Sequence, residues 1–182
     1  MLPWWEEFFV DEQKMHKPWW TVAAVEFVTP RLTKEMTVFE YGCGNSTLYF
    51  SQYVKQVIST EHDKEWYSKM LAICPDNVML HLRESVDGGQ YAKTITEQNC
   101  KFDIVLVDGA DRDTCIYHAI NQIKDNGVII VDNAEMDYCA VGVKYLLDNG
   151  FKKINCEGAV YGVPFARNET AIFYKDKNCL GI

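Results

Sequence analysis

Several features that would assign this chain to a common class are missing from its sequence. None of its seven cysteines form a C-x-x-C pair and their number is odd, so we expect reduced thiols rather than a disulfide framework or a zinc site. No apolar run approaches the length of a membrane span. The first residues are acidic and aromatic, unlike a signal peptide. Basic residues number 18 against 26 acidic ones, and the net charge of −8 disfavours a nucleic-acid surface. We therefore expect a cytoplasmic protein that binds neither membrane nor nucleic acid.

A chain of 182 residues is long enough for one domain with a sizeable core. Residues 1–20 stand apart as an aromatic N-terminal arm, and residues 21–182 form the expected domain. The aromatic residues of the arm are Trp4, Trp5, Phe8, Phe9, Trp19 and Trp20. The simpler interpretation is that these rings pack onto the domain. A compatible alternative is that some of them cover a ligand cleft.

Strand and helix patterns alternate along the domain. The expected strands cover residues 37–40, 57–61, 78–82, 102–107, 128–131, 151–156 and 170–175. The expected helices cover residues 21–32, 46–53, 63–71, 90–98, 113–126 and 134–149. Such alternation predicts an α/β fold with a doubly wound, mostly parallel, seven-stranded Rossmann-like sheet, and the last two strands predict an antiparallel hairpin. We expect the residues between that last pair, 157–169, to be a loop that either closes over a substrate or merely connects two edge strands.

The stretch Thr37–Ser51 (TVFEYGCGNSTLYFS) has the pattern of a strand, a tight turn and a helix. Gly42 and Gly44 allow torsions and close approaches that a Cβ would forbid. Asn45 or Ser46 can cap the following helix, whose N-terminus favours an anionic group. The dinucleotide fingerprint wants a small residue where Thr47 stands. Taken alone, this stretch fits a ligand site and an ordinary turn equally well.

Acidic residues follow all five expected parallel strands, at Glu40, Glu61, Glu84-Ser85, Asp108 and Asp132-Asn133. In an open parallel sheet, ligands bind outside these carboxyl ends. Glu61 lies nineteen positions after Gly42, close to the offset of about 20 at which an acid accepts ribose hydroxyls. Glu84 or Ser85 is placed to bind an adenine edge. The strand ends therefore predict a cleft for an adenosine-containing ligand, and their charge suits a cation.

Four motifs in order, VFEYGCGNSTLYFS, VISTEHDKEWY, FDIVLVDGADRDTC and GVIIVDNAEM, cover most of the chain. They resemble a small group of class I S-adenosylmethionine (SAM)-dependent methyltransferases, many without an assigned substrate. The resemblance implies SAM as cofactor and methyl transfer to a small molecule, and we expect a hydroxyl of a sugar or metabolite. The residues expected at the cofactor are Glu40, Gly42, Gly44, Asn45, Ser46, Glu61, His62, Glu84, Ser85 and Asp108. The histidine supports the turn at Glu61 rather than the chemistry.

Asp108 with Asp132-Asn133 also matches the metal-ligand pattern of catechol-type O-methyltransferases, which implies a possible magnesium ion. The lysine of that pattern is replaced here by Asp111, which puts the metal and the base in doubt. We expect Asp108 or Asp132 to accept a proton. Arg112 either orients the substrate or pairs with its acidic neighbours at the surface. These three residues are the expected catalytic set.

Three other functions remain open at this point. The Asp108–Asp111 spacing also fits the D-x-x-D pair of aminopropyltransferases, which share the fold. A nicotinamide-dependent oxidoreductase is weakened by Thr47 and by the lack of basic strand-end residues. A non-catalytic SAM-binding protein fits the many tryptophans. The methyl acceptor and the oligomeric state are not determined by the sequence.

Overall fold

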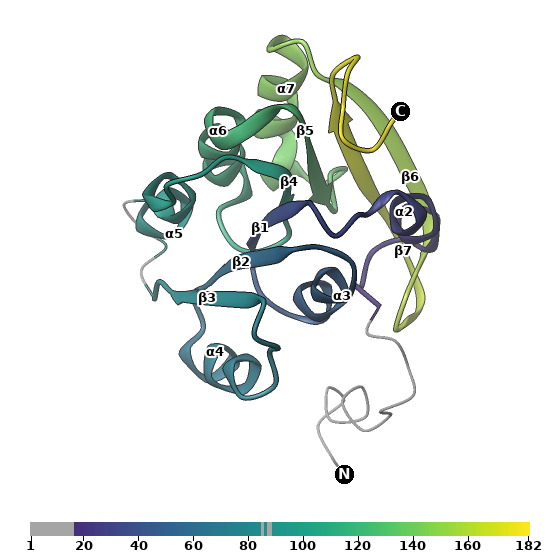
Figure 1. Ribbon diagram of the computed structural model, residues 1–182. Helices are drawn as coiled ribbons and strands as arrows, with labels where there is room; N and C mark the ends of the chain where they lie inside the picture. Colours follow the sequence, from purple (N-terminus) through teal and green to yellow (C-terminus); the bar gives the residue numbers. More distant parts are fainter. Residues whose placement is uncertain (1–16, 85, 87–88) are drawn as a thin grey trace.

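The computed structural model describes residues 17–84, 86 and 89–182. Its strands are β1 (Thr37–Tyr41), β2 (Gln56–Glu61), β3 (Val78–Leu82), β4 (Phe102–Val107), β5 (Ile123–Asp132), β6 (Lys152–Val160) and β7 (Val163–Tyr174). They form one sheet in the order β3-β2-β1-β4-β5-β7-β6 (Figure 1). Strands β1 to β5 are parallel, and β7 runs antiparallel to both β5 and β6. The expected doubly wound sheet with a C-terminal antiparallel hairpin is confirmed.

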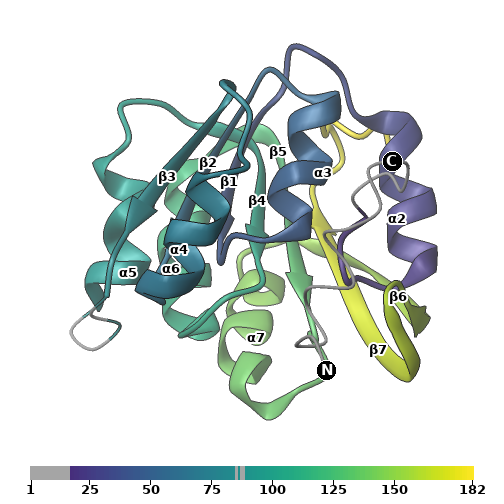
Figure 2. The same ribbon diagram turned by 90° about the horizontal axis from the view of Figure 1, so that it is seen from below.

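Helices cover both faces of the sheet (Figures 1 and 2). One face carries α2 (Val22–Val28), α3 (Asn45–Tyr53) and α4 (Lys64–Leu71), and the other carries α5 (Gln90–Lys93), α6 (Arg112–Gln122) and α7 (Ala140–Asp148). The described part of the chain also contains short 3-10 helices, η1 (Thr29–Arg31), η3 (Thr94–Glu97) and η4 (Asp137–Cys139). In the described part of the chain, no helix is long and apolar enough to cross a membrane.

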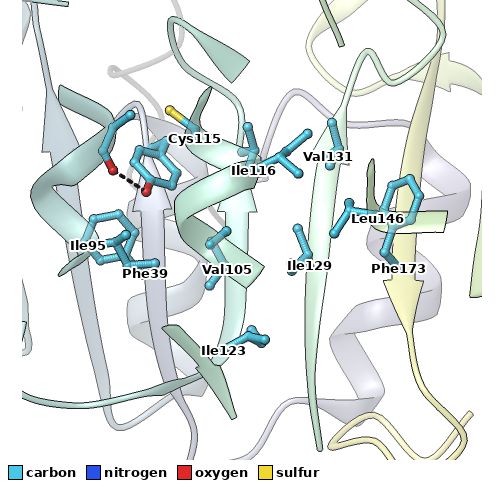
Figure 3. Packing of buried hydrophobic residues seen from close by; sticks show 14 of the residues in the cluster. Phe39, Ile95, Val105, Cys115, Ile116, Ile123, Ile129, Val131, Leu146 and Phe173 are labelled. Carbon is cyan, nitrogen blue, oxygen red and sulfur yellow. Dashed lines mark hydrogen bonds between the residues drawn. The ribbon is translucent and has the colours of Figure 1, made fainter. Parts of the chain in front are cut away.

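The core is divided by the sheet, because successive side chains of a strand point to opposite faces. Phe39, Val105 and Phe173 pack under α6 and α7 (Figure 3). Val38 and Ile104 face α2 and α3 on the other side. All six residues of β4 are buried, as expected for a central parallel strand. The central part of the sheet is therefore covered on both faces, whereas the edge strands β3 and β6 remain partly exposed.

Several expected boundaries were wrong, among them one end of each of the last two helices. The helix expected to reach residue 126 ends at Gln122, because Ile123 is extended and pairs with Phe102 of β4. Gly127 lies in β5, where a Cβ would come within 2.4 Å of the Ile123 side chain, so its role is close packing rather than helix termination. The helix expected from residue 134 begins only at Ala140, after η4.

The segment 157–169, expected as a loop, is mostly strand. Strand β6 continues to Val160 and β7 begins at Val163, so the connection is a tight turn. The hairpin is also tied to the start of the domain. Tyr161 donates its N–H to the Trp20 carbonyl at 3.0 Å, and Thr21 forms a bridge with Val160. Trp20 is buried and Trp19 half-buried, whereas residues 1–16 of the expected aromatic arm lie outside the described residues, so the arm stays a prediction.

Candidate active site

A cavity of about 710 Å³ opens at the carboxyl ends of β1, β2, β4 and β5. This is where an open parallel sheet binds its ligands, next to the point at which the strand order reverses. Most of the residues singled out from the sequence line it: Gly42, Gly44, Asn45, Ser46, Glu61, His62, Asp108, Asp132 and Asn133. Of the five acids that follow the parallel strands, Glu61, Asp108 and Asp132 line the cavity, whereas Glu40 lies outside the lining. Glu84 is exposed and also outside the lining, and Ser85 lies outside the described residues, so the adenine contact stays a prediction.

The turn after β1 is shaped by a contact between two backbones. Gly42 has φ of +88°, and a Cβ there would come within 2.8 Å of Gly109 Cα. A Cβ on Gly109 would come within 2.9 Å of Gly42 N and within 2.0 Å of the Tyr91 hydroxyl. Both glycines are thus required for the β1 and β4 ends to pack this closely. The sequence indicates this role of Gly109 only through its place directly after the strand-end acid Asp108.

Gly44 differs from Gly42, because a Cβ built on it would meet no atom within 4 Å. Its backbone is extended, and it lies at the N-cap of α3, which begins at Asn45. Asn45 and Ser46 are therefore helical residues, and neither is the cap that we expected. The Gly44 N–H instead donates to the Thr47 hydroxyl at 2.9 Å. Gly44 leaves open space at the cavity rather than filling a packing gap.

Glu40 braces this turn from beneath. Its carboxylate is fully buried and accepts hydrogen bonds from the hydroxyls of Ser46 and Thr47. Burial raises the pKa of Glu40 to about 7, against the opposing effect of those two hydroxyls. It does not line the cavity. We therefore assign Glu40 to the support of the turn and not to direct contact with a ligand.

Glu61, at the end of β2, is held by backbone N–H groups. Its Oε1 accepts from His62 N at 2.7 Å and Asp63 N at 2.8 Å, and its Oε2 accepts from Cys43 N at 3.2 Å. Asp63 caps α4, accepting from Trp66 N at 2.8 Å. Oε2 also accepts a weak 3.6 Å hydrogen bond from the Cys43 thiol. Because both of its bonds to Cys43 are long, Oε2 can still accept from a ligand hydroxyl.

Asp108 and Asp132 form an acidic pair at the ends of β4 and β5. Burial raises the pKa of both carboxyls, and the charge of Asp108 raises that of Asp132 further. Asp132 accepts a 2.6 Å hydrogen bond from the Thr170 hydroxyl. Thr170 pairs with Asp132 across β5 and β7, and its hydroxyl also accepts from Thr21 N at 3.1 Å. Nothing in the local sequence indicated Thr170, because its partners lie far away along the chain.

Arg112 is not part of a surface cluster with Asp111 or Asp113, and its role in orienting a substrate stays a prediction. Its guanidinium is mostly buried and bonds Asp108 Oδ1 at 3.2 Å and Asn133 Oδ1 at 3.3 Å. It also donates to the carbonyls of Gly109, Asp108 and Asp132. These bonds fix the loops after β4 and β5 to each other, so Arg112 positions the acids. It forms no described pair with Asp111 or Asp113.

Some of the oxygens considered as magnesium ligands therefore already accept hydrogen bonds from the Arg112 guanidinium. Arg112 bonds Asp108 and Asn133, and Thr170 bonds Asp132. Among residues 17–84, 86 and 89–182, no group of three or more His, Cys, Asp or Glu side chains is arranged to hold a metal ion. The donor set does not fit a resident metal as it stands.

Further lining residues come from α4, which the sequence did not assign to the site, and from Trp19 and the segment 157–169, for which a place at the cleft was one of two alternatives. Trp66 lines the cavity from α4 and donates its indole N–H to the Cys43 carbonyl at 2.7 Å. Trp19 and the β6–β7 hairpin, through Val160, Val163, Ala166 and Asn168, form the opposite wall. The hairpin thus contributes to the cavity as a strand pair and not as a loop.

No protein-family model matches the chain, and no curated protein sequence matches it. Solved structures do. Precorrin-6y C5,15-methyltransferase from Geobacter metallireducens GS-15 aligns with a TM-score of 0.65 and 15% identity, over 85% of this chain and 88% of its own. An rRNA methylase from Streptococcus thermophilus aligns with a TM-score of 0.58 and 14% identity, over 84% of this chain and 93% of its own.

The N-methyltransferase NodS from Bradyrhizobium japonicum WM9, in complex with S-adenosyl-L-homocysteine (SAH), has a TM-score of 0.58 and 12% identity over 85% of this chain and 84% of its own. Spermidine synthases also share the fold. The chain therefore has the Rossmann-like fold of class I SAM-dependent methyltransferases. Because an rRNA methylase is among these structures, the fold does not separate small-molecule from nucleic-acid substrates.

Proposed function

We propose that this protein is a SAM-dependent methyltransferase that methylates a hydroxyl group of a small molecule. One observation carries the proposal. The glycine turn after β1, Glu61 after β2 and the Asp108–Asp132 pair after β4 and β5 line a single cavity. Each of these groups was singled out from the sequence separately, and the fold brings them together.

The lining fits the cofactor. Gly44 leaves space for close approach of a ligand, and Glu61 Oε2 retains acceptor capacity for a ribose hydroxyl. The acids around the cavity favour a molecule that carries positive charge at its sulfur and amino group. A pyrophosphate ligand would instead require basic residues, and the described lining contains neither lysine nor arginine. When bound, SAM supplies an already activated methyl group, so in-line positioning matters more than acid–base strength.

Asp132 is the proposed proton acceptor. Asp132 would take the proton of the acceptor hydroxyl. SAM, when bound, would supply the methyl group, and the S–CH3 bond would break with its electron pair left on sulfur, so that SAH is the leaving group. Thr170 fixes the orientation of Asp132 through the 2.6 Å hydrogen bond. Arg112 holds Asp108 beside it and neutralises part of the negative charge of the pair. We place Arg112 where a catechol-type enzyme would use a metal, so the proposed reaction needs no resident magnesium.

The geometry favours methyl transfer over aminopropyl transfer. In the D-x-x-D pattern, Asp108 lines the cavity, but Asp111 is exposed, with φ of +46°, and is not part of the lining. The two carboxylates therefore do not converge on one amine. A nicotinamide cofactor and non-catalytic SAM binding remain as rivals that binding and turnover measurements distinguish.

The proposal is tested by calorimetric titration of the full chain with SAM, SAH and NAD. We expect SAM and SAH to bind and NAD not to bind. Glu61→Ala should weaken SAH binding by about 1–3 kcal/mol through lost hydrogen bonds. Glu61→Gln, which keeps the side-chain volume, checks that the loss does not come from unfolding, and Glu65→Ala on the exposed face of α4 is the control. NAD binding, or unchanged SAH affinity in both Glu61 variants, would contradict the placement.

A further inference from the structure

The cavity extends past the part that the proposed cofactor position uses. Along the sheet edge, Glu61 and the glycine turn belong to β2 and β1, whereas β5, β7 and β6 lie on the far side of β4. The remaining wall is formed by Asp132, Trp19 and the β6–β7 hairpin. We call this part, bounded by Trp19, Asp132, Val160, Val163, Ala166 and Asn168, the acceptor chamber.

The chamber is built from fixed elements. The backbone that follows Trp19 is tied down, because Tyr161 N donates to the Trp20 carbonyl at 3.0 Å and Thr21 bridges Val160. Thr21 N also donates to Thr170, which holds Asp132. The chamber wall and the proposed proton acceptor are therefore parts of one hydrogen-bonded unit.

Among the six residues that bound the acceptor chamber, the one charged side chain is the carboxylate of Asp132. The chamber's members are four apolar side chains, one amide and one carboxylate. Arg167 lies between Ala166 and Asn168, is exposed, and is directed to the opposite face by the alternation of the strand. Arg112 is already bonded to Asp108 and Asn133. Among the described residues, an anion in the chamber would find no free cationic partner for the water that it loses, which is unfavourable.

We propose that the acceptor chamber selects an uncharged or cationic acceptor with a flat apolar body, and excludes anionic ones. The inference rests on the proposed function, since it takes the other half of the cavity as the cofactor position. The apolar body lies between Trp19 and the hairpin valines, and the nucleophilic O–H or N–H is directed at Asp132. The Asn168 amide, which both donates and accepts, is the polar contact on the hairpin side.

Three aromatic probes of similar size but different charge test this directly: benzyl alcohol, benzylamine and benzoate. Each is titrated into the full chain saturated with SAH, and binding is followed by ligand-observed NMR. We expect benzyl alcohol and benzylamine to bind in the millimolar range and benzoate to bind at least about tenfold more weakly. Asn168→Lys should reverse that order by supplying a cation inside the chamber. Asn155→Lys, the same change at an exposed position of β6, should leave it as in the wild type.

Two sets of results would overturn the proposal. Benzoate binding as well as the other two probes, or none of the probes binding, would refute a chamber of this chemistry. The same order of affinities in Asn168→Lys as in Asn155→Lys would show that the probes bind elsewhere. Failure of SAH itself to bind is measured first and counts against the proposed function, so the two failures are distinguishable.

Discussion

Gly44 and Gly109 both line the cavity, yet substitution by alanine should affect them in opposite ways. At Gly109 the added Cβ would lie 2.0 Å from the Tyr91 hydroxyl and 2.9 Å from Gly42 N. Tyr91 is fully buried and Gly42 offers only backbone, so neither neighbour can move away cheaply. Overpacking of this kind typically costs about 1–3 kcal/mol. We expect Gly109→Ala to lose about 2 kcal/mol of unfolding free energy, or about 4–8 °C in Tm for a domain of this size.

At Gly44 the added Cβ meets nothing, so the fold should not change. Alanine is a poorer N-cap than glycine by roughly 0.5–1 kcal/mol. This loss is offset by about 0.4–1 kcal/mol, because alanine has less conformational freedom in the unfolded chain. The net change in stability should therefore be near zero. If the ligand approaches the turn backbone as proposed, however, the methyl group occupies its space, and SAH affinity should fall about tenfold or more.

Urea denaturation gives the unfolding free energy of each variant, and calorimetry gives its SAH affinity. Together these measurements test the two predictions. The expected result is a loss of stability in Gly109→Ala and a loss of binding without loss of stability in Gly44→Ala. Wild-type SAH affinity in Gly44→Ala would show that the cofactor does not pass this turn. Wild-type stability in Gly109→Ala would show that the two glycine backbones are not packed as described.

Three further predictions concern the acids and the metal. Asp132→Asn should lower kcat by about 10²–10⁴-fold while leaving SAH affinity unchanged. The wild-type rate should rise as the pH passes about 7, where Asp132 becomes a carboxylate. An Asp132→Asn variant as active as the wild type would remove this residue from the mechanism. Because burial raises the pKa of Glu40 to about 7, its contribution to stability is fully present below its unfolded pKa and is lost as the pH rises through about 7. Denaturation experiments should thus show that the unfolding free energy of Glu40→Gln increases relative to that of the wild type between pH 5 and pH 8. The control variant Glu65→Gln should show no such change. A difference between Glu40→Gln and wild type that does not depend on pH would mean that Glu40 titrates normally. Methyl transfer should be unaffected by EDTA, since Arg112 bonds the oxygens of Asp108 and Asn133, and a magnesium requirement in the same assay would contradict that assignment.

The sequence by itself determined the features that depend on near neighbours. The strand–turn–helix at residues 37–53, the buried strand Phe102–Val107 and the Asp63 cap each depend on a pattern contained within a few residues. The acids at the strand ends could also be predicted to meet, because parallel strands place their carboxyl ends at one edge of the sheet.

Tertiary structure decided how those acids are paired and what surrounds them. Thr170 reaches Asp132 across 38 positions, and Arg112 reaches Asn133 across 21, so neither contact leaves a local pattern in the sequence. The segment 157–169 contains glycine, asparagine and proline and was expected as a loop, but pairing with the opposite strand makes it a hairpin and a wall of the cavity. Local propensity is a weak preference that cross-strand hydrogen bonds and packing override. The sequence therefore determined which groups gather at the site, and only the fold determined which of them remain available to a ligand.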